Sequence, residues 1–120
     1  MTQKILIVDD SKLARMAVIK ALNALRPDWT RVEASNADEA LAQIKSEAPD
    51  VALLDFNMPG KDGLTLAVEI RKLAPQINLA VISANHQLEV IDRARAAGAY
   101  FLAKPLTEKS LGEFLNSSAK

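Results

Sequence analysis

Five residues with chemically useful side chains stand at the ends of short apolar runs in this chain: Asp9, Asp10, Asp55, Ser83 and Lys104. Three of these side chains are carboxylates. Carboxylates that are crowded together repel one another, and a hard cation held by their oxygen atoms relieves that repulsion. Among such cations, Mg²⁺ suits a site that combines a few carboxylates with phosphate oxygens. These residue types therefore indicate a magnesium site, provided that the fold brings the ends of the apolar runs together.

The apolar runs have the length and composition of β-strands. Residues 51–54 (VALL) run without a polar break into Asp55, and the turn residues of MPGKDG follow at 58–63. An uninterrupted run of this kind predicts a parallel strand that is buried on both faces and ends at Asp55. Residues 30–34 alternate polar and apolar side chains instead, which is typical of an edge strand. The other predicted strands are residues 4–8, 79–82 and 100–103.

Helical periodicity separates these strands. The first predicted helix begins at Ser11 and ends before Pro27. Asn36 opens the second, with Glu39 completing an Asn-led capping box, and Gly98 follows the fourth. The apolar residues expected to face the core are, helix by helix, Ala14, Val18, Ala21, Leu22 and Leu25; Ala37, Ala40, Leu41, Ile44 and Ala48; Leu66, Ala67, Ile70, Leu73 and Ala74; Ile91, Ala94 and Ala97; and, in a short fifth helix, Leu111, Phe114 and Leu115.

Five strands that alternate with five helices predict one α/β domain over residues 1–120. The expected architecture is a doubly wound parallel sheet with right-handed connections and helices on both faces. The carboxyl ends of all the strands then lie at one edge of the sheet, where α/β proteins collect their ligands. The five polar residues named above should therefore meet at that edge.

Composition excludes several classes of protein. The 15 basic and 15 acidic residues give a formal net charge of zero, so no global charge favours direct contact with nucleic acid. With no cysteine, the chain has no disulfide, thiolate metal site or cysteine nucleophile. No apolar stretch approaches the roughly 18 residues that a membrane span needs. We expect a cytoplasmic protein that does not bind membranes.

The ordered set of motifs resembles the response-regulator receiver domain, the phospho-accepting module of two-component signalling, over essentially the whole chain. We expect a single-domain, chemotaxis-type regulator, because the sequence has no room for an output domain after the last predicted helix. A receiver excised from a longer protein is the alternative, since its sequence would look identical. The resemblance implies the flavodoxin-like strand order 2-1-3-4-5. The matching residues are Asp9-Asp10, Asp55 with Asn57-Met58-Pro59-Gly60 and Asp62-Gly63, Ser83-Ala84, Gly98-Ala99 and Lys104-Pro105.

The resemblance also implies a role for each site residue. Asp55 would accept a phosphoryl group from a histidine kinase or a histidine phosphotransfer protein, and Lys104 and Ser83 would contact that group. The Mg²⁺ ligands would be Asp10, Asp55, the backbone carbonyl of Asn57 and, through water, Asp9. The same site should hydrolyse the aspartyl phosphate, so the chain would catalyse only its own phosphorylation and dephosphorylation.

Ser83 and Phe101 are the predicted switch residues. Phe101 stands three residues before Lys104, where the family has an aromatic residue that is often tyrosine. Phosphorylation would draw Ser83 towards the phosphoryl group and let Phe101 move inward. The face formed by the fourth helix, fifth strand and fifth helix would then change and control an unidentified output protein. The resemblance further implies a cis peptide bond between Lys104 and Pro105.

Two apolar residues of the first predicted helix do not belong to its core face. A step of about 100° per residue puts Leu13 and Met16 on the side opposite the core face. An exposed apolar residue needs no explanation by itself, and a harmless surface is the alternative. These two residues, however, lie in the first turns after Asp9-Asp10. We expect them to help dock the helical, histidine-bearing domain of the phosphodonor protein.

Two other functions fit parts of the sequence. A phosphohydrolase with an aspartate nucleophile would need an acid two residues after Asp55, and that position holds Asn57. A receiver-shaped binding module that no longer takes phosphate is the second alternative, and the intact acidic residues and Lys104 argue against it. His86, the only histidine, is expected to be a solvated residue at a helix start, and Trp29 a packing residue.

Overall fold

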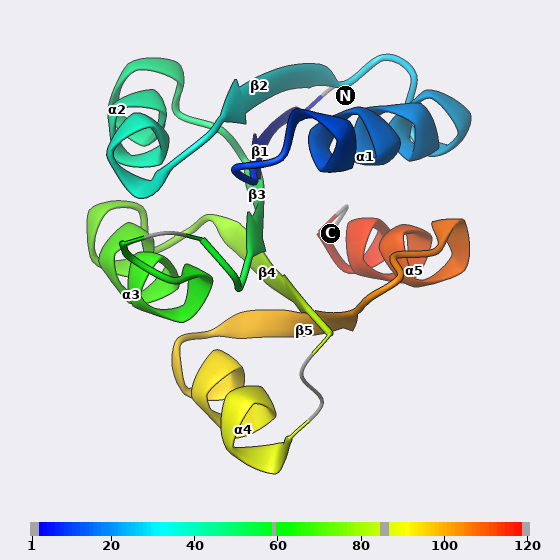
Figure 1. The fold of residues 1–120 in the computed structure, drawn as a ribbon. Coiled ribbons are helices and arrows are strands. Elements are labelled where there is room, and N and C mark those ends of the chain that lie inside the picture. Colours follow the sequence, from blue (N-terminus) through cyan, green and yellow to red (C-terminus); the bar gives the residue numbers. More distant parts are fainter. Residues whose placement is uncertain (1–2, 59, 85–86, 119–120) are drawn as a thin grey trace.

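The computed structural model describes residues 3–58, 60–84 and 87–118, and over these residues five strands alternate with five helices (Figure 1). None of the described helices is both long and apolar enough to cross a membrane. The elements in chain order are β1 (Lys4–Val8), α1 (Lys12–Leu25), β2 (Thr30–Ala34), α2 (Ala37–Glu47), β3 (Val51–Asp55), α3 (Gly63–Leu73), β4 (Asn78–Ser83), α4 (Leu88–Ala96), β5 (Ala99–Ala103) and α5 (Glu108–Ser118).

The strands form one parallel sheet in the order β2-β1-β3-β4-β5, which confirms the predicted flavodoxin-like order. Every residue of β3, the central strand, is buried, as its unbroken apolar sequence predicts. The register pairs Val8 of β1 with Leu54 of β3, and Asp55 of β3 with Ile82 of β4. The carboxyl ends of β1, β3 and β4 therefore lie side by side.

The sheet is covered on both faces. Helices α1 and α5 lie against one face, and α2, α3 and α4 lie against the other (Figure 1). Successive side chains of a strand point to opposite faces, so β1, β3, β4 and β5 each supply both cores, whereas β2 supplies only the core under α2, α3 and α4. The core under α2, α3 and α4 takes Leu6, Val8, Ala52, Leu54, Leu79 and Val81 from the strands, and the core under α1 and α5 takes Ile5, Ile7, Val51, Leu53, Ala80 and Ile82.

Side-chain caps fix where the helices begin. The Asn36 side chain accepts a hydrogen bond from the backbone N–H of Glu39 at 2.8 Å, as predicted. Glu39 accepts bonds from both the backbone N–H and the hydroxyl of Ser35, each at 2.7 Å. In a standard capping box this glutamate would accept from the capping residue itself, and here it accepts from the residue before the cap. These bonds tie the end of β2 to the first turn of α2.

The Ser35 bonds make the stability of the α2 start depend on pH. They lower the pKa of Glu39 below its ordinary value of 4.5. A lowered folded-state pKa contributes stability above the unfolded-state pKa, and that contribution is lost as pH falls through the folded-state pKa. Glu39→Gln should therefore be less stable than the parent at neutral pH, and the gap should close in acid. Urea unfolding across this pH range measures the gap, with Glu113→Gln as the matched exposed control. A gap independent of pH would contradict this account.

Four predictions about the helices need correction. Ala48 is exposed and lies outside the core, because it adopts a left-handed conformation (φ 46°) that ends α2. Leu73 is 49% exposed, because the last turn of α3 borders an open hollow of about 620 Å³ at the amino-end edge of the sheet. In α4, Val90 is buried although the predicted core face omitted it. Helix α5 is also longer than predicted, with 11 residues.

Candidate functional site

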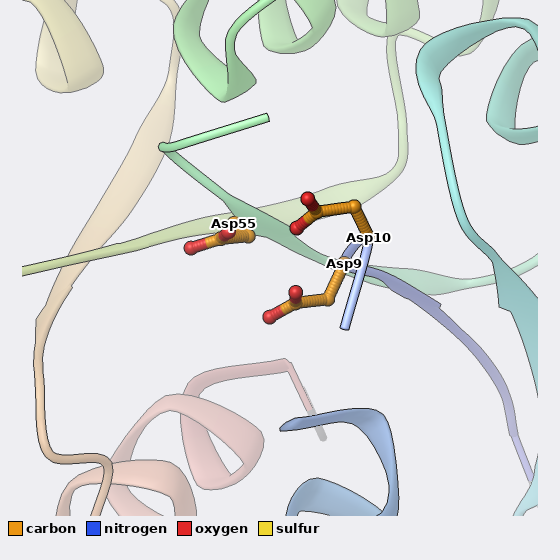
Figure 2. A group of neighbouring side chains, drawn as sticks. All are labelled: Asp9, Asp10 and Asp55. Carbon is orange, nitrogen blue, oxygen red and sulfur yellow. The ribbon is translucent and has the colours of Figure 1, made fainter. Parts of the chain in front are cut away.

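Three carboxylates meet at the carboxyl edge of the sheet. Asp9 and Asp10 follow β1, and Asp55 ends β3, the neighbouring strand. One carboxylate oxygen from each lies within 4.8 Å of those of the other two (Figure 2). The fold thus brings together the acids that the sequence separates by more than 40 positions.

Asp55 is the most enclosed of the three acids. Only 4% of its surface is exposed, whereas Asp9 is half-buried and Asp10 is exposed. The ammonium nitrogen of Lys104 lies 2.7 Å from Asp55 Oδ1 and forms an ion pair with it. Apart from this ion pair, Asp55 Oδ1 has no hydrogen-bond donor within the described part of the chain. Asp55 is therefore a buried carboxylate whose charge is opposed by a lysine and whose oxygen can still take a ligand.

Both burial and neighbouring negative charges act on the carboxyl group of Asp9. Burial raises the pKa of the Asp9 carboxyl, and the charges of Asp55 and Asp10 raise it further. The backbone N–H of Ser11, 2.9 Å from Asp9 Oδ1, and the charge of Lys104 act in the opposite direction. Because the net effect is a raised pKa, ionisation of the Asp9 carboxyl is disfavoured unless a further positive charge lies nearby. A hard cation with oxygen ligands supplies such a charge, so the residues present fit Mg²⁺.

Ser83 and Lys104 are held at the same edge by the pairing of β4 with β5. Ser83 is buried and follows Ile82, the residue paired with Asp55. The backbone N–H of Lys104 donates to the carbonyl of Ser83 at 3.0 Å. The peptide bond between Lys104 and Pro105 is cis, as the resemblance implied. The fold thus places a hydroxyl and an ammonium group beside the end of β3.

The start of α3 packs directly on the backbone of Asp55. The N–H of Gly63 donates to the carbonyl of Phe56 at 3.1 Å, and Phe56 in turn donates to Ile82 at 2.9 Å. A Cβ atom at Gly63 would lie 2.4 Å from the carbonyl oxygen of Asp55, closer than atoms can approach. The absence of a side chain at Gly63 therefore lets the start of α3 approach the backbone of Asp55 this closely. Asn57, the predicted backbone ligand, is exposed in the loop between them.

The remaining predicted site residues are not members of the acidic cluster. Phe101 is half-buried on β5 and packs against the core under α2, α3 and α4. Leu13 is 78% and Met16 is 53% exposed on α1, which confirms that they face away from the core. Trp29 is buried, as predicted. His86 lies outside the described residues.

Arg15 is a neighbour of the site that the sequence patterns did not predict. Its guanidinium donates to the backbone carbonyl of Asp9 and pairs with Glu33 at 2.9 Å. It thereby ties the first turns of α1 and the edge strand β2 to the acidic cluster. The sequence did contain one signal for this role, because Arg15 lies one turn after Ser11, the residue that caps α1. The Ser11 hydroxyl oxygen accepts a hydrogen bond from the backbone N–H of Ala14. Sequence periodicity marked only the apolar face of this helix.

Comparison with known proteins agrees with this geometry. The family model of the response regulator receiver domain matches residues 5–116. The chain is 33% identical over 119 residues to the chemotaxis protein CheY of Bacillus subtilis, covering 98% of both chains. It is 33% identical over 117 residues to the nitrate/nitrite response regulator protein NarL of Escherichia coli K12, covering 96% of this chain and 54% of that protein. A solved putative response regulator from Chloroflexus aurantiacus has a TM-score of 0.89 at 27% identity, with both chains fully covered. The chain therefore belongs to the response regulator receiver domain family.

Proposed function

We propose that this chain takes a phosphoryl group onto Asp55 from a histidine kinase or a histidine phosphotransfer protein. The observation that carries the proposal is the buried Asp55 carboxylate, which faces Lys104 at 2.7 Å and shares a 4.8 Å cluster with Asp9 and Asp10. Residues 1–120 would form one receiver domain, which acts in the cytoplasm. It acts through partner proteins, without direct contact with nucleic acid or membrane.

Asp55 is the nucleophile in this proposal. One of its carboxylate oxygens forms a bond to phosphorus while the bond from phosphorus to the donor imidazole nitrogen breaks, and the electron pair of that bond stays on the imidazole. Lys104 offsets the negative charge of the phosphoryl oxygens, and the Ser83 hydroxyl donates to one of them. Attack by water on the same phosphorus later restores the free Asp55 carboxylate.

The acidic cluster holds Mg²⁺ in this proposal. Asp10, Asp55 and the backbone carbonyl of Asn57 would bind it directly, and Asp9 would act through water. The bound cation supplies positive charge that stabilises the phosphoryl oxygens in the transition state. The side chain at position 57 is a neutral amide, which cannot act as the general acid or base of an aspartate phosphohydrolase. A signalling receiver therefore remains the better supported function.

The experiment that tests this function is intact-mass measurement after incubation with a small acyl phosphate. We expect the mass gain of one phosphoryl group when Mg²⁺ is present. We expect no gain when a chelator has removed the cation, because the ligand acids then repel the incoming phosphate. Equal labelling with and without Mg²⁺ would contradict the proposed metal site. No labelling in either condition would contradict phosphate acceptance itself.

Phosphorylation is expected to shift the population of two arrangements of the face formed by α4, β5 and α5. Ser83 would move towards the phosphoryl group, and Phe101 would move further into the core that it borders. Amide chemical shifts should therefore change in β5 and α4 as well as around Asp55. Two-dimensional NMR during steady labelling by an acyl phosphate measures them. Changes confined to the residues around Asp55 would contradict the switch and leave the phosphorylation intact.

Leu13 and Met16 are expected to contact the histidine-bearing helices of the phosphodonor protein. Combining Leu13→Ala with Met16→Ala should slow transfer from that protein by about tenfold or more, since truncating central apolar contacts costs more than 1 kcal/mol. Labelling by a small acyl phosphate should be unchanged, because the site itself is intact. Combining Val68→Ala with Leu73→Ala, both exposed apolar residues of α3, is the matched control. Equal loss with both donors would indicate a folding defect and contradict the docking role.

A further inference from the structure

Helices α3 and α4 lie side by side on the face of the sheet opposite α1 and α5 (Figure 1). Residues of both helices line a groove between them. Two adjoining hollows of about 390 and 350 Å³ make up this groove, and Val68 and Lys72 of α3 border both of them. On α4, Arg93 borders one hollow and Ala96 borders the other. We call this surface the α3–α4 groove and define it by Val68, Lys72, Arg93 and Ala96.

The cations of the α3–α4 groove have no acidic partners within the described residues. Lys72 and Arg93 are exposed, and the ion pairs of the described chain involve neither of them. The nearest acid on α3, Glu69, is held by Lys61 at 2.7 Å. Glu89 stands one turn before Arg93 on α4 but forms no ion pair with it in the described structure. The groove is therefore positive, although the whole chain has no net charge.

Arg71 adds a fixed positive charge at one end of the groove. Its guanidinium donates to the carbonyls of Pro75 at 2.8 Å, Ile77 at 2.7 Å and Gly98 at 2.7 Å. All these acceptors are backbone oxygens, so no carboxylate neutralises the charge. The bonds also join the end of α3 to the turn between α4 and β5. The walls of the groove are thus held together before any partner arrives.

The middle of the groove is apolar. Val68 is 44% exposed, and the small side chain of Ala96 leaves room beside it. One medium-sized apolar side chain can therefore contact both walls, while groups on either side of it face Lys72 and Arg93. An amphipathic helix offers this pattern, because residues three or four positions apart lie on the same face. Carboxylates one turn from an apolar residue would complement the two cations.

We infer that the α3–α4 groove binds an acidic amphipathic helix of a partner protein. The hollows are small, so we expect a weak, reversible complex typical of signalling. Leu13 and Met16 lie on α1, across the sheet from the groove, so this helix and a phosphodonor protein could bind at the same time. The inference does not depend on phosphorylation of Asp55, and either can fail without the other.

The test uses a fluorescent synthetic helical peptide that carries one Leu, with a Glu one turn before it and another one turn after it. A matched control peptide has Gln at both Glu positions. Anisotropy titration of the full chain should show tighter binding of the Glu peptide, and this preference should weaken as salt is raised. Combining Lys72→Glu with Arg93→Glu should weaken binding about tenfold or more, and Val68→Ala should weaken it to a lesser degree. Combining Lys45→Glu with Lys109→Glu changes the net charge equally at distant exposed positions and should have little effect.

Amide chemical shifts should place the Glu peptide on α3 and α4. The inference would be overturned by equal affinity for the Gln peptide, by an equal loss of binding in the distant charge control, or by chemical-shift changes centred elsewhere.

Two other occupants of the groove can be distinguished. Tighter binding of duplex DNA would assign the groove to nucleic acid, and self-association that the groove substitutions abolish would assign it to a second copy of this chain. Either result would overturn an acidic partner helix. If the charge reversals alter the circular dichroism of the chain, Lys72→Gln with Arg93→Gln provides the same comparison.

Discussion

Asp55→Asn is expected to reduce phosphoryl labelling by small acyl phosphates to background. Asparagine has nearly the same shape, but its neutral amide cannot attack phosphorus. Asp9 and Asp10 do not replace the lost nucleophile, because Asp55 alone among the three ends the central buried strand and faces Lys104. Intact-mass measurement at equal times and donor concentrations checks the result.

The control for this change is Asp28→Asn, which removes an exposed carboxylate from the connection between α1 and β2. This variant should be labelled as fast as the parent. The circular dichroism of Asp55→Asn should match that of the parent, since one of the three mutually repelling charges has been removed without a change of volume. Labelling of Asp55→Asn at the parent rate would show that another residue accepts the phosphoryl group.

Gly63→Ala is expected to lower both the stability and the labelling rate. Its new methyl group would lie 2.4 Å from the Asp55 carbonyl oxygen, so the end of β3 or the start of α3 must move. Overpacking of this kind costs about 1–3 kcal/mol of unfolding free energy. Movement of Asp55 away from Lys104 should slow labelling by about tenfold or more, since positioning supplies much of the rate. Urea unfolding and initial labelling rates measure the two effects.

Gly112→Ala is the matched control for this overpacking. A Cβ atom there would lie 3.6 Å from a methyl carbon of Leu25, an ordinary contact, and the residue lies within α5. Alanine is favoured over glycine in a helix by about 1 kcal/mol, so this variant should be as stable as the parent or more stable. If Gly63→Ala unfolded at the same urea concentration as the parent, the close approach to Asp55 would not constrain the site.

The sequence predicted the sheet well because each strand carries its own local signal. The five predicted strands agree with the observed ones to within one residue at each end, and the strand order follows the family resemblance. The acids could be placed at one edge because parallel strands put their carboxyl ends together. The cap at Asn36 was likewise predictable, since its side chain bonds a residue only three positions away.

Contacts between distant segments were not predictable in the same way. Arg71 binds carbonyls near Gly98, 27 positions further along the chain, and no local pattern marks that pairing. The closeness of Gly63 to Asp55 depends on the path of the loop between them. Leu73 fits the apolar period of α3 but lies past the end of the core, because periodicity gives the face of a helix and not the edge of the sheet.

The most direct test of the central claim is to find which residue carries the phosphoryl group. Borohydride reduces an aspartyl phosphate to homoserine, which peptide mass spectrometry can assign to one position. After incubation with an acyl phosphate and Mg²⁺, we predict homoserine at position 55 and an unmodified Asp at positions 9 and 10. Homoserine at position 9 or 10, or at position 55 in equal amount without Mg²⁺, would contradict the account.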